Sequence, residues 1–430
     1  MTNEQIIALI QREVVPAIGC TEPVAVALCT AHAVEALGER PERIDVRLSA
    51  NILKNAMGVG IPGTGMSGLP IAVALGALIG KSSYGLEVLK DVNPAAVAEA
   101  KAWLAGHPLS IDLTKESNEL LYIDVRCAAG GRESRAIIAR EHAKLVYRSG
   151  PCAEALDIRD QLGKEETAPE EEGLTLRRVF EFATTAPLAD LEFINESRRL
   201  NEAAAEEALK GNYGHELGKT LSRPLGKGIM GDSIFSHIIS ATSCACDARM
   251  AGAMIPVMSN SGSGNQGIAA TLPVVVFARE NHNTEEELTR ALVLSHLTAI
   301  YIKQSLGVLS CLCGCVVAST GSSCGMTYLM GGSYEQVSYS VKNMIANLAG
   351  MVCDGAKPSC ALKVSSGVST AVLSAMLAVQ NHSVSSYEGL IEDDVDRCIR
   401  NLTRLGSVGM QETDRMVLDI MTHKKNKADE

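Results

Sequence analysis

The segment CLCGCVVASTGSSCGMTYLMGG, residues 311–332, consists of small and apolar side chains and carries no charge. The charge-poor zone extends outward from Ala291 to Ser333, where Lys303 is the one charged residue and His296 could also be protonated. Glycines interrupt this zone, so it lacks the uninterrupted run of about 20 apolar residues that spans a membrane. We therefore expect it to form the buried centre of a helical domain, and we expect no membrane as a partner.

The whole chain has the composition of a large globular protein. Its 430 residues suffice for two domains, and its aromatic share of 3% means that small side chains must fill the core. The formal net charge of −11 argues against nucleic acid as a partner. Residues 1–15 are typical of a capped amphipathic helix and not of a signal peptide, so we expect a cytoplasmic protein.

Hydrophobic periodicity separates an N-terminal region, residues 1–157, from the rest of the chain. Helix signals occur here in residues 3–37 and 67–80, and alternation predicts strands at 43–49 and within 109–148. Gly130–Gly131 predicts a hairpin turn between two of these strands. The strands are expected to form a small, mainly antiparallel sheet.

The C-terminal region, residues 173–430, is expected to be almost entirely helical. The predicted helices are 173–184, 188–211, 233–257, 284–307, 334–350, 385–403 and 411–422. Residues 158–172 are charged and poor in apolar side chains, which predicts a linker or solvated loop before them. The two regions together predict an α+β fold, in which the N-terminal helices pack on a mostly helical domain.

Cysteines are concentrated in the helical region. Six of the thirteen lie within fifty residues, namely Cys311, Cys313, Cys315, Cys324, Cys353 and Cys360. The chain has no C-x-x-C pair typical of zinc sites, and a disulfide framework is not expected in a reducing compartment. Thiolates in this number therefore favour an iron–sulfur cluster. Five cysteines elsewhere are expected to be core residues: Cys29, Cys127, Cys244, Cys246 and Cys398.

The spacing of these thiols suggests which of them meet. On a continuous helix, Cys311 and Cys315 would share a face and Cys313 would point elsewhere, so the three are not expected to bind one metal together. Cys353 and Cys360 flank a loop with Gly and Pro that can bring two thiolates to one cluster. A third ligand must then come from the segment before that loop. A cluster with three cysteine ligands leaves one iron open as a Lewis acid.

Two glycine runs share the spacing G-x-G-x-x-G, at residues 63–68 and 262–267. A dinucleotide site needs a strand directly before the glycines, and we expect a helix-like segment before the second run instead. We interpret the runs as tight turns that open helices, where backbone N–H groups could hold a substrate carboxylate. Close helix packing is the alternative. Side-chain donors favour ligand binding at the second run: Ser261, Ser263, Asn265 and Gln266.

Cys20 lies far from the other candidate thiols. It belongs to Gly19-Cys20-Thr21-Glu22-Pro23, directly before a predicted helix, and a helix N-terminus lowers the pKa of a thiol. This position predicts a base, a nucleophile or a metal ligand. The alternative is an incidental thiol near a helix cap, with Glu22 complementing the helix dipole.

Four segments in the same order resemble the L-cysteine desulfidase family, which is related to the α-chain of iron–sulfur L-serine dehydratases. They are GCTEPVAVAL (19–28), GTGMSGLPIAVALGALIG (63–80), MSNSGSGNQGIAATLPVV (258–275) and CDGAKPSC (353–360). The similarity spans nearly the whole chain. Cys20-Thr21-Glu22 replaces a segment with Ser, His and Thr in the dehydratase relatives, which favours the desulfidase branch.

The resemblance implies a [4Fe–4S] cluster and no pyridoxal phosphate. The cluster ligands would be Cys313, Cys353 and Cys360, and Cys20 would be the catalytic base. The cluster would be sensitive to oxygen, so air-purified protein is expected to lose it. The substrate-binding residues are expected at the N-terminal motif and both glycine runs: Thr21, Glu22, Gly63, Gly65, Ser261, Gly262, Ser263, Gly264 and Asn265.

The implied reaction is the β-elimination of L-cysteine to hydrogen sulfide, ammonia and pyruvate. An open iron would bind the β-substituent of this small amino-acid substrate, and a base would remove the α-proton. We also expect a homodimer. The alternatives are an iron–sulfur L-serine dehydratase, a non-catalytic amino-acid-binding sensor, and a pyridoxal-phosphate enzyme. The last would use one of four lysines: Lys54, Lys227, Lys357 or Lys363.

Overall fold

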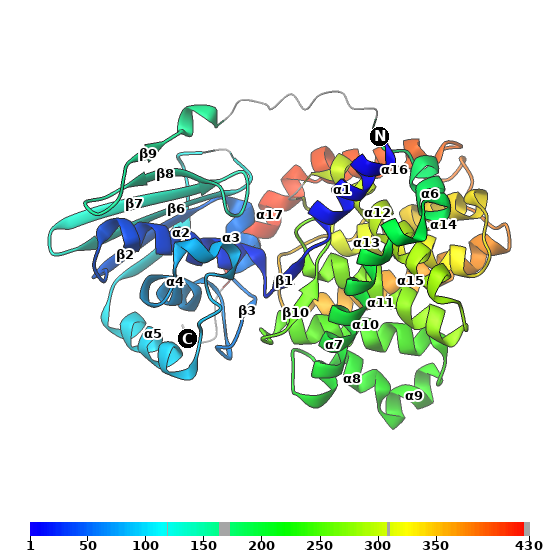
Figure 1. Cartoon of the computed structure of the whole chain (residues 1–430), viewed down its shortest axis with the longest axis horizontal. Coiled ribbons are helices and arrows are strands. Elements are labelled where there is room, and N and C mark those ends of the chain that lie inside the picture. The colour runs from blue at the N-terminus through cyan, green and yellow to red at the C-terminus, as the bar shows by residue number, and fades with distance from the viewer. Residues whose placement is uncertain (118, 163–172, 308–309, 425–430) are drawn as a thin grey trace.

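The computed structural model describes residues 1–117, 119–162, 173–307 and 310–424. Figure 1 shows a sheet with its covering helices beside a larger, mostly helical body. The predicted α+β fold class is confirmed. The predicted linker falls largely on residues 163–172, which lie outside the described residues, so the domain boundary stays a prediction.

The sheet has six strands in the order β5-β2-β6-β7-β8-β9. Their bounds are β2 Arg43–Leu48, β5 Leu109–Leu113, β6 Tyr122–Ala129, β7 Arg132–Ala139, β8 Leu145–Ser149 and β9 Leu156–Asp157. The β2–β5 pair is parallel and the other pairs are antiparallel, so the sheet is mainly antiparallel as predicted. Gly130 and Gly131 form the β6–β7 turn with φ of 54° and 76°, which glycine adopts without strain.

Helices cover one face of this sheet. The helices of this part are α2 Thr21–Leu37, α3 Ala50–Ala56, α4 Leu69–Leu78 and α5 Pro94–Gly106. Alternate residues of β2, Ile44, Val46 and Leu48, are fully buried, and α2 packs on β6 and β7. The α3 helix occupies a stretch where only a glycine-rich loop was expected. It is too short for helical periodicity to indicate it.

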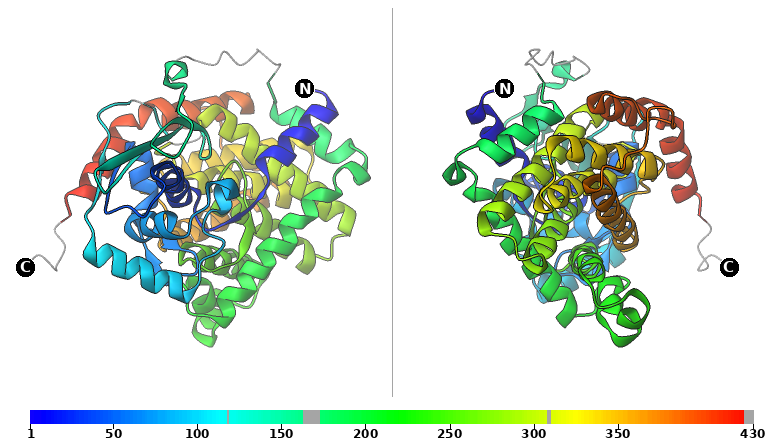
Figure 2. Two further views of the ribbon diagram at one scale, coloured as in Figure 1. Left: turned by 60° about the vertical axis from the view of Figure 1, so that its left-hand side comes forward. Right: turned by 90° about the vertical axis from the view of Figure 1, so that its right-hand side faces the viewer.

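The remaining helices are α1 and those from α6 onward. Their bounds are α1 Asn3–Glu13, α6 Leu176–Thr185, α7 Asn195–Lys210, α8 Leu217–Ser222, α9 Pro224–Met230, α10 Ile234–Met250, α11 Gly264–Glu280, α12 Glu285–Leu306, α13 Gly314–Leu329, α14 Tyr334–Leu348, α15 Cys360–Val379, α16 Val395–Arg404 and α17 Gln411–Thr422. All but one belong to the helical body, and the exception, α17, packs on α3 with Leu418 in the core of the sheet part. Figure 2 shows the α8–α9 pair as a green projection at the lower edge of the helical body.

Short elements join the longer ones. The strand pairs are β1 Pro16–Ile18 with β10 Pro256–Met258, and β3 Gly60–Ile61 with β4 Met66–Ser67. Single helical turns occupy Ser82–Glu87, Arg159–Gln161, Leu188–Asp190, Glu192–Ile194 and Leu405–Gly409. The β1–β10 pair carries the chain from the helical body into the sheet part.

The helical predictions need three corrections. The helix expected at 233–257 ends at Met250, because Gly252 (φ 84°) turns the chain toward β10. The helix expected at 385–403 begins only at Val395. Four helices of the C-terminal region had no predicted range: α8, α9, α13 and α15. Helix α11 follows the second glycine run, which was expected to open a helix.

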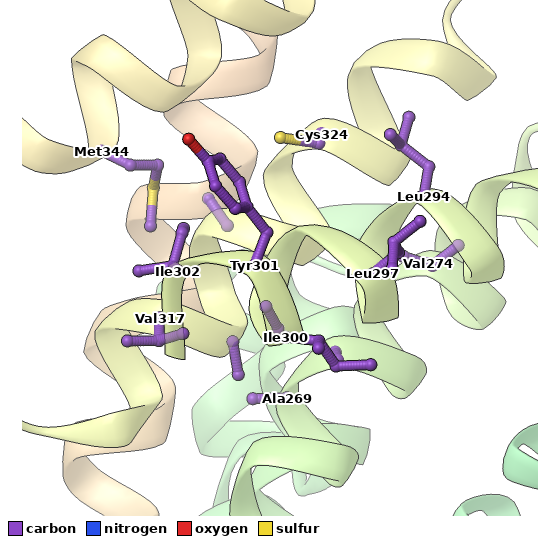
Figure 3. Close-up of a cluster of buried hydrophobic side chains, with 14 of the residues drawn as sticks. Ala269, Val274, Leu294, Leu297, Ile300, Tyr301, Ile302, Val317, Cys324 and Met344 are labelled. Carbon is purple, nitrogen blue, oxygen red and sulfur yellow. The ribbon is translucent and has the colours of Figure 1, made fainter. Parts of the chain in front are cut away.

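Helix α13 is the centre of the helical body, as the charge-free segment predicted. It packs against α11, α12, α14 and α15, and its residues from Cys315 to Thr327 are buried. Figure 3 shows Ile300 and Ile302 of α12 and Val317 of α13 in this buried cluster.

One helix in the described part of the chain, α15, is long and apolar enough to cross a membrane. Its mean hydropathy is 1.5, and half of the apolar stretch is buried inside the protein. It packs against α10, α13 and α14. Core helices of globular proteins meet the same criterion, so α15 alone is weak support for a membrane span.

The packing of α13 on α12 depends on glycine at position 321. A Cβ atom there would lie 2.2 Å from the carbonyl oxygen of Ser295. Gly321→Ala is therefore expected to destabilise the protein by about 1–3 kcal/mol, the usual cost of overpacking a core. Urea denaturation measures this change in the free energy of unfolding.

Gly228→Ala in α9 is the matched control. No neighbouring described residue would lie within 4 Å of a Cβ atom at this position. Because alanine has the higher helix propensity, this variant should match or exceed the wild type by up to about 1 kcal/mol. Equal stability of the two variants would contradict the proposed close contact between α12 and α13.

Candidate functional site

A cavity of about 130 Å³ lies between the start of α2 and the loops that precede α11, α13 and α15. Most of the predicted site residues line it: Cys20, Glu22, Ser261, Gly262, Ser263, Asn265, Cys313, Cys353 and Cys360. These residues come from four separate segments of the chain. The cavity therefore brings together the N-terminal motif, the second glycine run and the cysteine-rich region.

Four predicted residues lie outside the lining of this cavity. Thr21 is adjacent, because its Oγ1 donates to the Gly262 carbonyl oxygen at 3.3 Å. Gly264 packs behind the lining against Arg249. Gly63 faces Met254 instead, and a Cβ atom at Gly65 would meet no described residue within 4 Å. The structure thus does not bring the first glycine run to the cavity.

Two short extended segments place Cys313 beside Cys353. Leu312 and Val352 form an antiparallel bridge, and the Cys353 N–H donates to the Cys311 carbonyl oxygen at 2.6 Å. Helix α13 begins only at Gly314, with Cys313 as its N-cap. The assumption of a continuous helix through residues 311–315 was therefore wrong, because this segment pairs with another segment instead of coiling.

Cys315 was not among the expected cluster ligands, yet it also lines the cavity. Its Sγ lies 3.5 Å from Cys313 Sγ and 3.4 Å from the Lys363 carbonyl oxygen. Cys360 enters from a third segment as the first residue of α15. Four thiols of the cysteine-rich region thus surround one space, together with Cys20.

The donor set fits a cluster better than a single ion. Among the described residues, no three His, Cys, Asp or Glu side chains are grouped closely enough to hold one metal ion. In an iron–sulfur cluster each thiolate binds a different iron, so the ligands stand further apart and surround the group. Cys313, Cys353 and Cys360 on three backbone segments around one cavity meet this requirement.

Buried cations accompany the thiols. Lys303 is 9% exposed and lines the cavity, and burial lowers its pKa to about 8 although the Cys353 and Cys313 thiolates act to raise it. Lys363 Nζ donates to the Val352 carbonyl oxygen at 2.7 Å and pairs with Asp354, which holds the loop before α15. Lys303 is the one charged residue of an apolar zone in the sequence, and this signal could have identified it as a candidate site residue.

All four lysines considered for pyridoxal phosphate form ion pairs in the structure. Lys54 pairs with Asp414 and Lys227 with Asp232. Both Lys357 and Lys363 pair with Asp354. Lys363 is the member of this set that lines the cavity. The absence of pyridoxal phosphate stays a prediction.

Arg249 of α10 is the main cavity residue that sequence reasoning missed. Its Nη2 donates to the Gly19 carbonyl oxygen at 2.9 Å, and its Nη1 donates to Asn265 Oδ1 at 3.1 Å. Asn55 also lines the cavity and donates to Glu22 Oε1 at 3.3 Å. Both residues come from helices that carry no local signature, so only the fold reveals them.

Cys20 is the N-cap residue of α2 and is 1% exposed. Burial raises the pKa of this thiol to about 12, while the nearby Arg249 lowers it and Glu22 raises it further. The expectation of a lowered pKa was wrong, because the loss of hydration outweighs the helix terminus. The thiol of Cys20 is therefore neutral in the protein without its cluster and substrate.

A buried histidine supports the glycine run from behind. His296 Nδ1 accepts from Asn260 Nδ2 at 3.1 Å, and its Nε2 lies 2.9 Å from Thr271 Oγ1. Thr271 Oγ1 itself donates to the Gly267 carbonyl oxygen, so Nε2 must be the donor to Thr271. Burial lowers the pKa of His296 to about 3, so the imidazole is neutral at physiological pH.

This histidine makes stability depend on pH. Between about pH 6.5, the pKa of an unfolded histidine, and pH 3, the unfolded chain binds a proton that the folded protein does not. The stabilisation is therefore complete above pH 6.5 and is lost as the pH falls, by on the order of 4 kcal/mol. Urea denaturation from pH 7 to 4 should give a smaller slope for His296→Gln than for the wild type. An unchanged slope, alongside the exposed control His423→Gln, would contradict this assignment.

A buried cavity surrounded by cysteine thiols is typical of iron–sulfur enzymes as a class. The family model described as serine dehydratase alpha chain matches residues 83–419. The chain belongs to this family, and it is a lyase-type enzyme related to the iron–sulfur serine dehydratases.

Relatives align along nearly the whole chain. The UPF0597 protein of Phocaeicola vulgatus is 66% identical over 429 residues, which cover 98% of both chains. The UPF0597 protein BF3560 of Bacteroides fragilis is 66% identical over 422 residues, with 98% of both chains covered. The UPF0597 protein of Porphyromonas gingivalis is 51% identical over 429 residues and 99% of both chains. These names state no activity.

Proposed function

We propose that this protein is an iron–sulfur-dependent lyase that converts L-cysteine and water to pyruvate, ammonia and hydrogen sulfide. One observation carries the proposal: Cys313, Cys353 and Cys360 line a single cavity, and Cys20 lines it from the N-terminal motif. The family supplies the reaction class, since its members are related to iron–sulfur serine dehydratases.

Cys313, Cys353 and Cys360 would hold the cluster. When bound, a cluster with three cysteine ligands supplies an open iron, a Lewis acid suited to the β-substituent of the substrate. Lys303 offsets the charge of the thiolates, because its ammonium faces Cys353 and Cys313. The ion pairs of Lys357 and Lys363 with Asp354 hold the segment between the two later ligands in place.

Cys20 Sγ is the proposed acceptor of the α-proton of the substrate. The proton transfer requires the thiolate, and Arg249 is the neighbouring charge that favours it. The second glycine run contributes backbone N–H groups at the start of α11, where Ser263 caps the helix.

The choice between cysteine and serine rests on the N-terminal motif. Cys20-Thr21-Glu22 resembles the desulfidase branch, and Glu22 and Cys20 both line the cavity. An iron–sulfur L-serine dehydratase is the second candidate function, because the matching family model is described as serine dehydratase alpha chain. A non-catalytic amino-acid sensor would show binding without turnover.

Anaerobic reconstitution tests this proposal. We expect the full-length protein to bind iron and sulfide, to absorb in the visible range, and to form sulfide and pyruvate from L-cysteine faster than ammonia and pyruvate from L-serine. If the protein turns over L-serine faster than L-cysteine, its substrate is L-serine and the desulfidase assignment is wrong. Iron-replete protein that forms pyruvate from neither amino acid would refute the lyase, and so would full activity of iron-free protein.

A further inference from the structure

Arg249 is a buried cation that forms no ion pair with an acidic side chain in the described part of the chain. The residue is 4% exposed, and its guanidinium donates to two neutral oxygens, those of Gly19 and Asn265. It also lies within hydrogen-bond reach of the Cys20 thiol. Its Nε has no hydrogen-bond partner among the described residues. Burying a guanidinium without a counter-charge is costly. The arrangement therefore indicates that a ligand supplies the anion.

The surroundings hold this guanidinium in one position. A Cβ atom at Gly264 would lie 2.2 Å from Arg249 Nε, so glycine at the first position of α11 lets the side chain lie against the helix start. Gly19 and Asn265 accept from the two Nη atoms. Three contacts from two segments, Gly19 and the start of α11, fix a planar donor group that lines the cavity. Such a fixed fork is suited to a carboxylate.

A second charge lies near the same thiol. Glu22 lines the cavity, and its Oε1 accepts from the amide of Asn55. Arg249 and Glu22 both act on Cys20, the first lowering and the second raising the pKa of its thiol. Cys20 thus has one cation and one anion close to it, in a cavity that is otherwise rich in thiols.

We propose that Arg249 binds the α-carboxylate of the substrate and that Glu22 faces its ammonium group. This inference rests on the proposed function, which it deepens by naming the residues that recognise the charged groups of the substrate. The α-carbon carries both groups, so binding at these two charges places its hydrogen beside Cys20 Sγ. The site then accepts free α-amino acids and rejects their amides, their esters and the decarboxylated amines.

The test compares L-alanine with L-alaninamide. L-Alanine has no β-leaving group, and the amide keeps the ammonium but lacks the carboxylate charge. Anaerobic calorimetry on the cluster-loaded wild type should show about 10- to 100-fold tighter binding of L-alanine, as expected for a charge-assisted hydrogen bond. Arg249→Gln should remove this preference, and Arg249→Lys should keep part of it.

Arg279→Gln is the matched control. Arg279 is an exposed arginine of α11 whose Nη1 pairs with Glu202 at 3.1 Å, so its loss should leave the preference unchanged. The inference fails if Arg249→Gln retains the preference, or if the wild type binds both ligands equally or neither. If Arg249→Gln does not fold, the wild-type comparison and Arg249→Lys still decide the matter.

The two proposals can fail separately. If the protein prefers L-alanine through Arg249 but forms no pyruvate, the carboxylate site is supported and the lyase activity is refuted. If the wild type forms pyruvate from L-cysteine and Arg249→Gln has an unchanged KM, the lyase activity is supported and the carboxylate site is refuted. If both proposals hold, Arg249→Gln raises the KM for L-cysteine about 10- to 100-fold.

Discussion

Replacing Cys353 by serine is expected to reduce the iron content of reconstituted protein to background and to abolish pyruvate formation. Cys353 lies at the centre of the proposed ligand set, because the Leu312–Val352 bridge holds it beside Cys313. A serine hydroxyl is a harder and less acidic ligand than a thiol, so it does not replace the thiolate on iron. Iron and sulfide analysis with a visible spectrum measures the loss without relying on activity.

Cys324→Ser is the matched control for this prediction. Unlike the half-buried Cys353, Cys324 is fully buried, and it lies within α13, where Ser340 Oγ donates to its Sγ at 3.8 Å. This variant should keep its iron. A Cys353→Ser protein with the wild-type spectrum would contradict the ligand set. Cys315→Ser adds a further check: if it loses iron while Cys313→Ser retains it, the ligand before the loop is Cys315.

The second large effect concerns the ion pair that ties α17 to α3. Lys54 is 2% exposed, and its ammonium pairs with Asp414 of α17. Asp414→Asn would leave a buried ammonium unpaired, so we expect a loss of about 3–5 kcal/mol in the free energy of unfolding. Urea denaturation measures this loss. The exposed pair of Asp419 with His423 provides the control, since Asp419→Asn should change stability by less than about 1 kcal/mol.

Replacing both partners separates the cost of an unpaired charge from the value of the pair. Lys54→Met combined with Asp414→Leu should recover most of the stability lost in Asp414→Asn, because no charge remains to be buried. An Asp414→Asn protein as stable as the wild type would contradict this account. The pair also lies next to the candidate site, because Gly355, in the loop between Cys353 and Cys360, packs on the Lys54 backbone.

Elements with local signals were predictable from the sequence. Thr2 and Gln5 form the capping box at the start of α1, and Gly130–Gly131 form the predicted hairpin turn. These signals work because capping and turn conformations depend on side chains a few residues apart. The burial of α13 was predictable for a related reason, since a long segment without charge is stable only inside the protein.

Elements that depend on distant partners were not predictable. The strand β10 exists because β1 pairs with it, and residues 311–313 are extended because Val352 pairs with Leu312. Neither pairing leaves a periodic pattern in so few residues. The second glycine run therefore follows a short strand, and not the helix-like segment that was expected.

The sequence by itself determined the chemistry of this protein: the thiols, the glycine turns and the resemblance to an iron–sulfur enzyme family. Only the tertiary structure decided which groups share a cavity. It adds Arg249 and Cys315, leaves out Gly63 and Gly65, and shows that burial and not the helix terminus dominates the Cys20 thiol. The physical reason is that proximity and desolvation arise from packing between segments far apart in the chain, whereas residue type and local turn geometry do not.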